Sequence, residues 1–600
     1  MGKVQQLSLQ QFSTANNCST RMAWWVLLGI CIAVAGQQAV ASSLPPPCDS
    51  EIYCTGELLR QVQQAKLFTD DKFFVDMPLK ESPEVVLERF QKLVNETPGR
   101  DLSQEQLKVF VDENFSPRGQ ELENWEPPDW TDSPPLLQGI ADKKLQSWAR
   151  DLNAIWRQLG RQMKPEVKTS PDRHSLIYVP NPLIVPGGRF IEYYYWDSFW
   201  VIEGLLLSNM TATAKGMIEN FLYLVDKLGH IPNGGRVYYE RRSQPPFLTL
   251  MVESYWKHTN DTDFLRHNLH LLEAEYQFWQ DHRAVNVSFG GKEYTLNRYN
   301  VQVGGPRPES YMKDVETAAG LDEGAREILW AELKSAAESG WDFSSRWFLP
   351  ESSLLAASLK DTKTSAIVPV DLNAILCRVE QLLATFYGVL GNSEKANFFQ
   401  AAHERRVAAV RAVLWSNSTE VWLDYNLQQE RHNEAFYPTN LMPLWMECGV
   451  DVATSEKALR YLESSSALSY PHGVPTSLVR TQQQWDLPNA WAPLQDVVIS
   501  GLAKSSLPRA QELAFTLAQS WIRMNLAVYE KYHYMYEKYD VEGDGKPGGG
   551  GEYQVQEGFG WTNGLALRLL HLYGDRLTSA GTLLFRSWLC VGACLVLSLI

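Results

Sequence analysis

Three loops of this chain each place an aspartate directly after a tryptophan: Trp196-Asp197, Trp341-Asp342 and Trp485-Asp486. An indole ring beside a carboxyl group excludes water, which disfavours the charged form and raises the pKa. A general acid that works near neutral pH needs such a raised pKa, and cleavage of a glycosidic bond usually takes two carboxyl groups. Three loop glutamates are candidates for the second group: Glu309, Glu537 and Glu552. For each Trp-Asp pair, core packing of the tryptophan with a solvated aspartate is the alternative.

Arginines occur in loops of the same kind. Arg189, Arg242 and Arg307 lie in the segments PGGRF, RRSQPP and GGPRPES. Glycine lets a backbone approach a ligand closely because it carries no side chain. A guanidinium presents its donors in a fixed fork, which suits paired hydroxyl groups or a carboxylate that must stay ionised. We therefore expect these arginines to face a ligand; a surface salt bridge is the alternative for each one.

Residues 185–200, VPGGRFIEYYYWDSFW, combine glycine, arginine, acids and aromatics in one stretch. The stretch shows neither the alternation of a strand nor the apolar stripe of a helix. We interpret it as a backbone turn that sets Arg189 beside an aromatic wall. Aromatic residues make up 12% of the chain, and such rings can cover the apolar faces of an uncharged ligand. Packing of these rings in the core is the alternative.

Several other chemistries are disfavoured. The net charge of −15 argues against a nucleic-acid partner, which would need a basic face. No GK[ST] follows the four glycines at 548–551, and the chain has neither a G-x-S-x-G elbow nor a zinc-like Cys/His spacing. Asp540-x-Glu542-x-Asp544 begins like a calcium loop, but its twelfth position is Gly551 instead of the closing glutamate. We expect no metal and no cofactor.

The elements that must position these loops are helices. Apolar residues three and four apart, with capping or stop residues at the ends, predict helices in six segments: 82–96, 321–340, 370–392, 455–466, 508–532 and 563–574. Convincing strands are few, and no repeat period indicates a solenoid. We expect one all-α catalytic domain over residues 42–578, with paired helices closed into a ring and function on the long loops. The glycine run at 548–551 is expected to form a flexible lid or a close-fitting wall that carries Glu552.

Both ends of the chain are apolar. Residues 1–41 end in an apolar run and Ala39-Val40-Ala41, which is typical of a secretory signal peptide, and Met22 offers an alternative start. Residues 579–600 begin with small residues and end in an apolar tail, which resembles a GPI-anchor signal that is removed. A short membrane anchor and a soluble protein are the alternatives.

The cysteines and sequons fit a secreted protein. Cys48 and Cys54 are close enough in sequence to pair, whereas Cys377 and Cys448 lie in apolar contexts and are expected to be buried free thiols. N-glycosylation is expected at four sequons: Asn209, Asn260, Asn286 and Asn417.

Several long motifs together resemble the trehalases, which hydrolyse α,α-trehalose. PGGRFIEYYYWDSFW and QWDLPNAWAP look like the two signature segments of that family. IPNGGR, RRSQPP, GGPRPES, ESGWDFSSRW, MYEKYD and GGGGEYQVQEGFGWTNG match its other loops, from about residue 47 to residue 576. The signal, the Cys48/Cys54 opening and the apolar end look most like the vertebrate GPI-anchored type. The resemblance implies an (α/α)6 toroid and inverting hydrolysis of trehalose with water to one α- and one β-glucose.

The resemblance also implies roles for individual residues. Asp342 of GWDFSSRW would be the general acid and Glu537 of YEKYD the general base. The implied substrate ligands are Arg189, Trp196, Asp197, Asn233, Arg242, Ser243, Gln244, Arg307, Glu309, Gly340 and Glu552. In the first signature, Phe199 stands where a tyrosine is common, which removes one hydroxyl group.

Two other readings remain open. A different inverting α-glycosidase or a phosphorylase could use the same helical ring, and a GPI-anchored sugar-binding protein without turnover could keep the pocket. The second reading predicts that one catalytic carboxyl group is missing, yet Asp342 and Glu537 are both present. The sequence leaves the oligomeric state open, including a homodimer.

Overall fold

The computed structural model describes residues 44–350, 357–543 and 545–579. The expected signal peptide, and the expected anchor signal beyond residue 579, lie outside the described residues, and the domain limits stay predictions. No helix in this part of the chain is both long and apolar enough to cross a bilayer.

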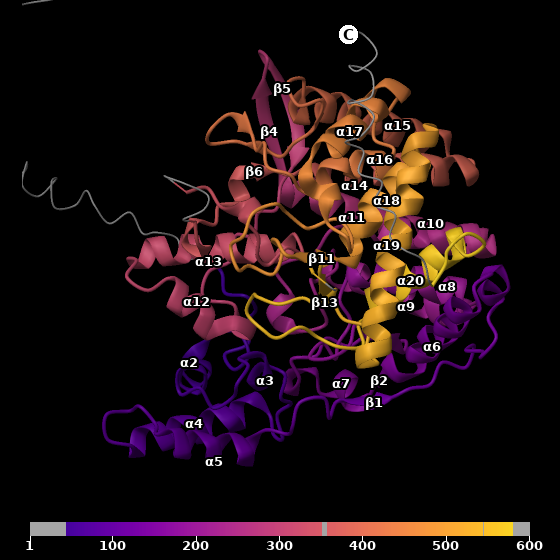
Figure 1. Cartoon of the computed structure of the whole chain (residues 1–600). Helices are drawn as coiled ribbons and strands as arrows, with labels where there is room; N and C mark the ends of the chain where they lie inside the picture. The colour runs from indigo at the N-terminus through magenta and orange to yellow at the C-terminus, as the bar shows by residue number, and fades with distance from the viewer. Residues whose placement is uncertain (1–43, 351–356, 544, 580–600) are drawn as a thin grey trace, which may run out of the picture. The chain divides into compact units, whose positions relative to one another are not determined.

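The fold is built around an inner ring of helices (Figure 1). Each inner helix packs on the next in chain order, and the last packs again on the first. Its members are α8 (Asp197–Leu207), α10 (Leu248–Thr259), α14 (Val370–Val389), α16 (Met442–Met446), α18 (Ala492–Lys504) and α20 (Gly560–Tyr573).

A second set of helices alternates with the inner ones along the chain. Its members are α6 (Lys143–Leu159), α9 (Thr211–Leu228), α11 (Thr262–Arg283), α15 (Ser393–Ala409), α17 (Val452–Ser464) and α19 (Pro508–Tyr532). α9 packs on α8 and α10, α15 on α14, and α19 on α18 and α20, while α6 packs on α20. This alternation of inner and outer helices confirms the predicted (α/α)6 ring.

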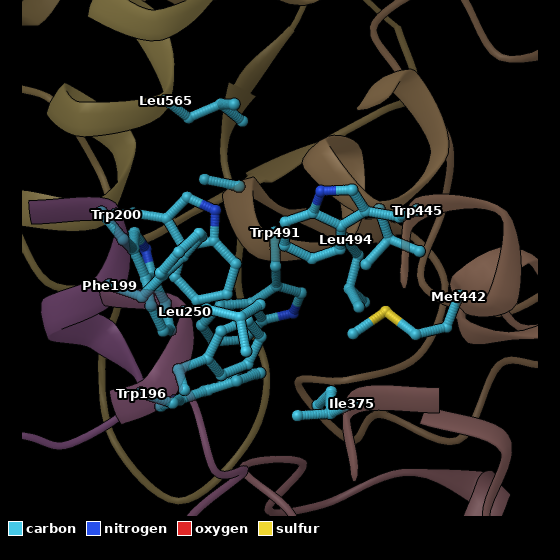
Figure 2. Packing of buried hydrophobic residues seen from close by; sticks show 14 of the residues in the cluster. Trp196, Phe199, Trp200, Leu250, Ile375, Met442, Trp445, Trp491, Leu494 and Leu565 are labelled. Atoms are coloured by element: carbon cyan, nitrogen blue, oxygen red, sulfur yellow. The ribbon is translucent and has the colours of Figure 1, made fainter. Parts of the chain in front are cut away.

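Aromatic side chains fill the middle of the ring. Figure 2 shows Trp196, Phe199 and Trp200 near the start of α8 together with Trp445 of α16 and Trp491 before α18. The ring centroids of Phe199 and Trp200 lie 5.2 Å apart, edge to face. α8 buries nine of its eleven residues. A helix that is buried on all sides shows no apolar stripe, which is why the sequence around residues 197–200 did not look helical.

Helices α2 (Gly56–Gln64), α3 (Lys72–Val75), α4 (Pro83–Glu96) and α5 (Gln104–Asn114) form the N-terminal segment, drawn in indigo in Figure 1. This segment has an apolar cluster of its own, with Phe74, Phe90 and Phe110 among its members. Tyr194 and Tyr239, which belong to the loops of the ring, are also part of that cluster. The segment therefore packs directly behind two of the loops that the sequence marks as functional.

The strands are short and antiparallel. In one sheet, β12 (Lys538–Asp540) lies between β11 (Asn489–Trp491) and β13 (Lys546–Pro547), and Trp491 is paired with Lys538. The other strands of the described residues form sheets with the orders β1-β2-β3, β10-β9-β6, β4-β5 and β7-β8. Their bounds are β1 (Leu122–Asn124), β2 (Gly160–Met163), β3 (Leu183–Ile184), β4 (Ala284–Phe289), β5 (Lys292–Asn297), β6 (Ile367–Val368), β7 (Trp415–Ser416), β8 (Val421–Trp422), β9 (Tyr425–Asn426) and β10 (Arg431–His432). The remaining α-helices are α7 (Pro165–Thr169), α12 (Tyr311–Thr317) and α13 (Glu323–Glu338).

The predicted helices agree with the structure in every case, with small shifts at their ends. The segments at 508–532 and 82–96 correspond to α19 and α4, and the segment at 370–392 corresponds to α14, which ends at Val389. The segments at 321–340, 455–466 and 563–574 correspond to α13, α17 and α20.

The prediction of free thiols at Cys377 and Cys448 is wrong. The two cysteines form a disulfide with a Cα–Cα distance of 5.8 Å across a sequence separation of 71. Cys377 lies on α14 and Cys448 directly follows α16, and these two helices pack on one another. The pairing depends on ring packing, which sequence spacing alone does not reveal. Cys48 and Cys54 also form a disulfide.

Candidate active site

One cavity collects the loops that the sequence singled out. Both expected catalytic residues, Asp342 and Glu537, line it. The expected ligands that also line it are Arg189, Trp196, Asp197, Asn233, Arg242, Gln244, Arg307, Glu309, Gly340 and Glu552. Residues from about 189 to 552 therefore meet in one cavity, although they are far apart in the sequence.

Ser243 is the exception among the expected ligands. Its hydroxyl group donates to the carbonyl oxygen of Ile231 at 2.7 Å, and its backbone N–H donates to Glu338 at 2.9 Å. The side chain is buried and does not line the cavity. Ser243 thus holds the loop that carries Arg242 and Gln244.

Asp342 follows the end of α13 and the turn at Gly340. Gly340 has a φ of +80°, and a Cβ atom there would lie 2.6 Å from the Trp196 ring. Only glycine therefore allows both the turn and the contact with Trp196. Burial raises the pKa of Asp342 to about 7, and the nearby Arg307 opposes this shift. Asp342 can thus hold a proton near neutral pH.

Glu537 directly precedes β12 and is 1% exposed. Its backbone is held on both sides, because its N–H donates to Gln556 O at 3.0 Å and its carbonyl oxygen accepts from Trp561 at 3.0 Å. Burial raises the pKa of Glu537, and Lys538 opposes the shift. Oε1 lies 3.1 Å from the Lys538 ammonium group, and among the described residues Oε2 has no hydrogen-bond partner. A fixed carboxylate with unoccupied acceptor sites can take a proton from a water molecule.

Asp197 is the third carboxyl group of the cavity. Burial, together with the negative charges of Glu537 and Asp342, raises its pKa to about 8. Asp197 is therefore protonated at neutral pH and can donate a hydrogen bond to a ligand. Asp486, the aspartate of the third Trp-Asp pair, lies elsewhere and accepts hydrogen bonds from Ser345 and Ser477 at 2.7 Å each. For that pair, the alternative of core packing agrees with the structure, but the aspartate is buried at 0% exposure and not solvated.

The arginines of the cavity are paired with carboxylates. Arg242 contacts Glu309 at 2.6 Å and Asn233 at 2.8 Å. Arg307 contacts Asp314 at 2.6 Å and Glu552 at 2.8 Å. Both guanidinium groups are 5% exposed or less. These are buried ion pairs instead of surface salt bridges, and they fix the positions of the arginine donors.

Arg189 is held by Asp70, a residue that the sequence did not indicate. Its Nε and Nη2 donate to the two carboxylate oxygens of Asp70 at 2.7 and 2.6 Å. The guanidinium also lies over the Tyr553 ring, with 4.6 Å to its centroid. Asp70 precedes α3 in the N-terminal segment, and no local motif around it indicates this role.

Aromatic rings complete the cavity wall, and most of them were not predicted individually. Trp485 and Trp491 stack in parallel at 3.9 Å between centroids. The other rings that line the cavity, besides Trp196, are Phe190, Tyr194, Tyr239, Tyr553, Phe559 and Trp561. Trp485, Trp491 and Trp561 belong to motifs quoted for the family resemblance, so the signal was present although no role was assigned. Hydroxyl-binding polar groups and apolar rings together suit a neutral sugar.

Comparison with known proteins agrees with this site. A family model described as Trehalase matches residues 66–574. The chain is 56% identical to the trehalase of Homo sapiens, over 96% of this chain and 97% of that protein. It is 55% identical to the trehalase of Oryctolagus cuniculus, over 96% of this chain and 98% of that protein. The neutral trehalase Nth1 from Saccharomyces cerevisiae shares the fold, with a TM-score of 0.52 at 24% identity over 66% of this chain and 74% of that chain.

Proposed function

The chain belongs to the trehalase family, and from that premise we propose that Asp342 and Glu537 are the acid and base of an inverting hydrolysis. The overall reaction is cleavage of α,α-trehalose with water to two glucose molecules. The observation that carries the assignment is that the two carboxyl groups line one cavity in different environments. Asp342 has its pKa raised to about 7, whereas Glu537 lies beside the Lys538 ammonium group and keeps Oε2 without a partner among the described residues.

In this mechanism, Asp342 protonates the oxygen that bridges the two sugars, so one glucose leaves as a neutral molecule. Glu537 takes a proton from a water molecule on the opposite face, and that water attacks the anomeric carbon. The attacked glucose is released as the β anomer and the leaving glucose as the α anomer. An inverting pair needs room for this water, so we expect carboxyl groups roughly 6.5–9.5 Å apart.

The test is a trehalose assay on wild type, Asp342→Ala and Glu537→Ala, with the first anomers followed by NMR. We expect each variant to lose rate by roughly 100-fold or more, and wild type to release equal α- and β-glucose. Two α-glucose molecules would refute inversion, and a requirement for phosphate would identify a phosphorylase. A wild-type protein that binds trehalose without releasing glucose would identify a sugar-binding protein.

We also propose that the protein is secreted, glycosylated and held at the cell surface by a GPI anchor. The two disulfides support an oxidising compartment. The four sequon asparagines are all exposed: Asn209, Asn260, Asn286 and Asn417. Release of activity from intact cells by a phosphatidylinositol-specific phospholipase is expected, and activity that stays with the cells would contradict the anchor.

A further inference from the structure

A chain of polar contacts joins the two catalytic residues behind the cavity wall. The Nζ atom of Lys538 lies 3.1 Å from Oε1 of Glu537. The same Nζ donates to Oε1 of Gln484 at 2.6 Å. The Nε2 atom of Gln484 in turn donates to the backbone carbonyl oxygen of Asp342, also at 2.6 Å. Neither Lys538 nor Gln484 lines the cavity.

Lys538 is fully buried, at 0% exposure, and Gln484 is 1% exposed. A buried ammonium group is costly unless it is paired. Its carboxylate partner is the expected base, and its other neighbours are the faces of Trp491 and Tyr553, with 5.0 and 5.3 Å to the ring centroids. The ammonium group therefore has few partners that could replace Glu537.

Gln484 is itself held in place by the second signature segment. Its backbone carbonyl oxygen accepts hydrogen bonds from Trp491 Nε1 at 2.8 Å and from Asn489 Nδ2 at 3.1 Å. The side-chain amide is oriented by its own two contacts, with Oε1 toward Lys538 and Nε2 toward the Asp342 carbonyl oxygen. A change in the position of either contact is transmitted to the other.

We propose that Lys538 and Gln484 are positioning residues of the reaction, and this proposal rests on the assignment of Glu537 as base. Lys538 keeps the Glu537 carboxylate ionised and oriented toward the attacking water. Gln484 links Lys538 to the backbone of Asp342, so that the acid and the base keep a fixed separation. An inverting pair depends on that separation because a water molecule must fit between the base and the sugar.

Other charged groups also face Glu537, so the effect of Lys538 must be separated from theirs. Arg189 lowers the pKa of Glu537, but its guanidinium is committed to Asp70. Asp197 and Tyr553 are the other titratable groups that interact with it. Lys538 is the only cation that the described residues place in direct ion-pair contact with Glu537. Lys538 also opposes the burial shift of the Glu537 pKa more strongly than Arg189 does.

The experiment measures kcat and KM for trehalose across pH for wild type, Lys538→Met, Lys538→Arg and Gln484→Met. Loss of the ammonium group raises the pKa of Glu537, and a base works only when ionised. On the acidic limb of the pH profile, kcat falls as the pH drops and the base is protonated. We therefore expect Lys538→Met to move this acidic limb to higher pH by about one unit or more. At pH values below that limb, kcat should fall by about 10-fold or more.

KM is expected to change little in Lys538→Met, because the side chain does not touch the cavity. Lys538→Arg keeps the charge and should return the acidic limb toward that of wild type. Gln484→Met removes both amide contacts and should lower kcat with KM again little changed. If Lys538 has only a structural role, Lys538→Met will lower the melting temperature while the folded protein keeps the wild-type pH profile, and that result overturns the proposal.

Two controls keep the outcome decisive. If Lys538→Met does not fold, an unchanged kcat and pH profile in folded Gln484→Met overturns the proposal by itself. Glu537→Gln distinguishes this inference from the proposed function. An active Glu537→Gln enzyme would refute the base assignment, whereas an inactive one together with a wild-type-like Lys538→Met would refute only the positioning role.

Discussion

At the scale of single residues, the cavity separates two carboxyl groups by environment. Asp342 is buried near Arg307, and its pKa is raised to about 7. Glu537 is buried beside Lys538; burial raises its pKa, and the ammonium group opposes that effect. The two carboxyl groups therefore differ in the charged partner that each one faces, as an acid and a base require.

The pH profile of kcat/KM is expected to be bell-shaped. Activity requires ionised Glu537, so it falls as the pH drops through the raised pKa of that group. Activity also requires protonated Asp342, so it falls as the pH rises through about 7. Asp197 titrates at about 8 in the same cavity, so initial rates should also be measured for Asp342→Asn and Asp197→Asn. The fall in activity near pH 7 should disappear in Asp342→Asn and remain in Asp197→Asn. If it remains in Asp342→Asn, it belongs to another group.

Much of the site could be predicted residue by residue, because its members lie in long local motifs. Arg189, Asp342 and Glu537 lie in such motifs, and all three line the cavity. Asp70 was missed, because its contact with Arg189 joins residues 119 positions apart. Lys538 was also missed: its sequence position beside the base was visible, but its burial and its contact with Gln484 exist only in the folded chain.

At the scale of elements, the structure favours a close-fitting wall over a flexible lid for the glycine run at 548–551. A Cβ atom at Gly548 would lie 2.8 Å from Cγ of Lys538, and one at Gly551 would lie 2.9 Å from atoms of the Gln484 side chain. The loop thus packs on Lys538 and Gln484, the two residues that we propose to position the acid and base. A Cβ atom at Gly549 would meet nothing within 4 Å.

This difference predicts unequal effects of two neighbouring substitutions. Gly548→Ala places a methyl group against the Lys538 side chain and Asn489, so it should displace the loop or the lysine and lower kcat by several-fold. Gly549→Ala points into open space and should keep wild-type kinetics. Steady-state assays of the two purified variants, with melting temperatures as a check on folding, test this expectation. Equal activity in both would favour a freely moving lid.

The disulfides illustrate a different limit of sequence reading. The sequence indicates that Cys48 and Cys54 can form a disulfide, because only six positions separate them. Cys377 and Cys448 were expected to be free because each lies in an apolar segment. Their pairing follows from the contact between α14 and α16, and helix periodicity predicts helices without predicting which neighbours they meet.

At the scale of the whole molecule, the N-terminal segment supports the cavity wall. It supplies Asp70 to Arg189, and a fully buried charge cluster joins it to the first signature segment. Lys72 contacts Asp76 at 2.6 Å and Glu192 at 2.7 Å, with all three side chains at 0% exposure. Glu192 also accepts a hydrogen bond from Tyr194, which lines the cavity. The aromatic-rich stretch at 185–200 is therefore held from behind by charge as well as by packing.

Lys72→Met is expected to destabilise the protein strongly. The substitution leaves the carboxylates of Asp76 and Glu192 buried with one cation fewer, and breaking a buried ion pair in this way costs about 3–5 kcal/mol. Lys66→Met is a matched control, because Lys66 pairs with Glu316 at 3.1 Å in an exposed setting, where such a pair contributes about 1 kcal/mol or less. Thermal unfolding followed by circular dichroism should show a large fall in melting temperature for Lys72→Met and a small one for Lys66→Met. Equal melting temperatures would mean that the buried cluster does not hold the N-terminal segment on the ring, and the positioning of Arg189 and Tyr194 would then have to come from apolar packing alone.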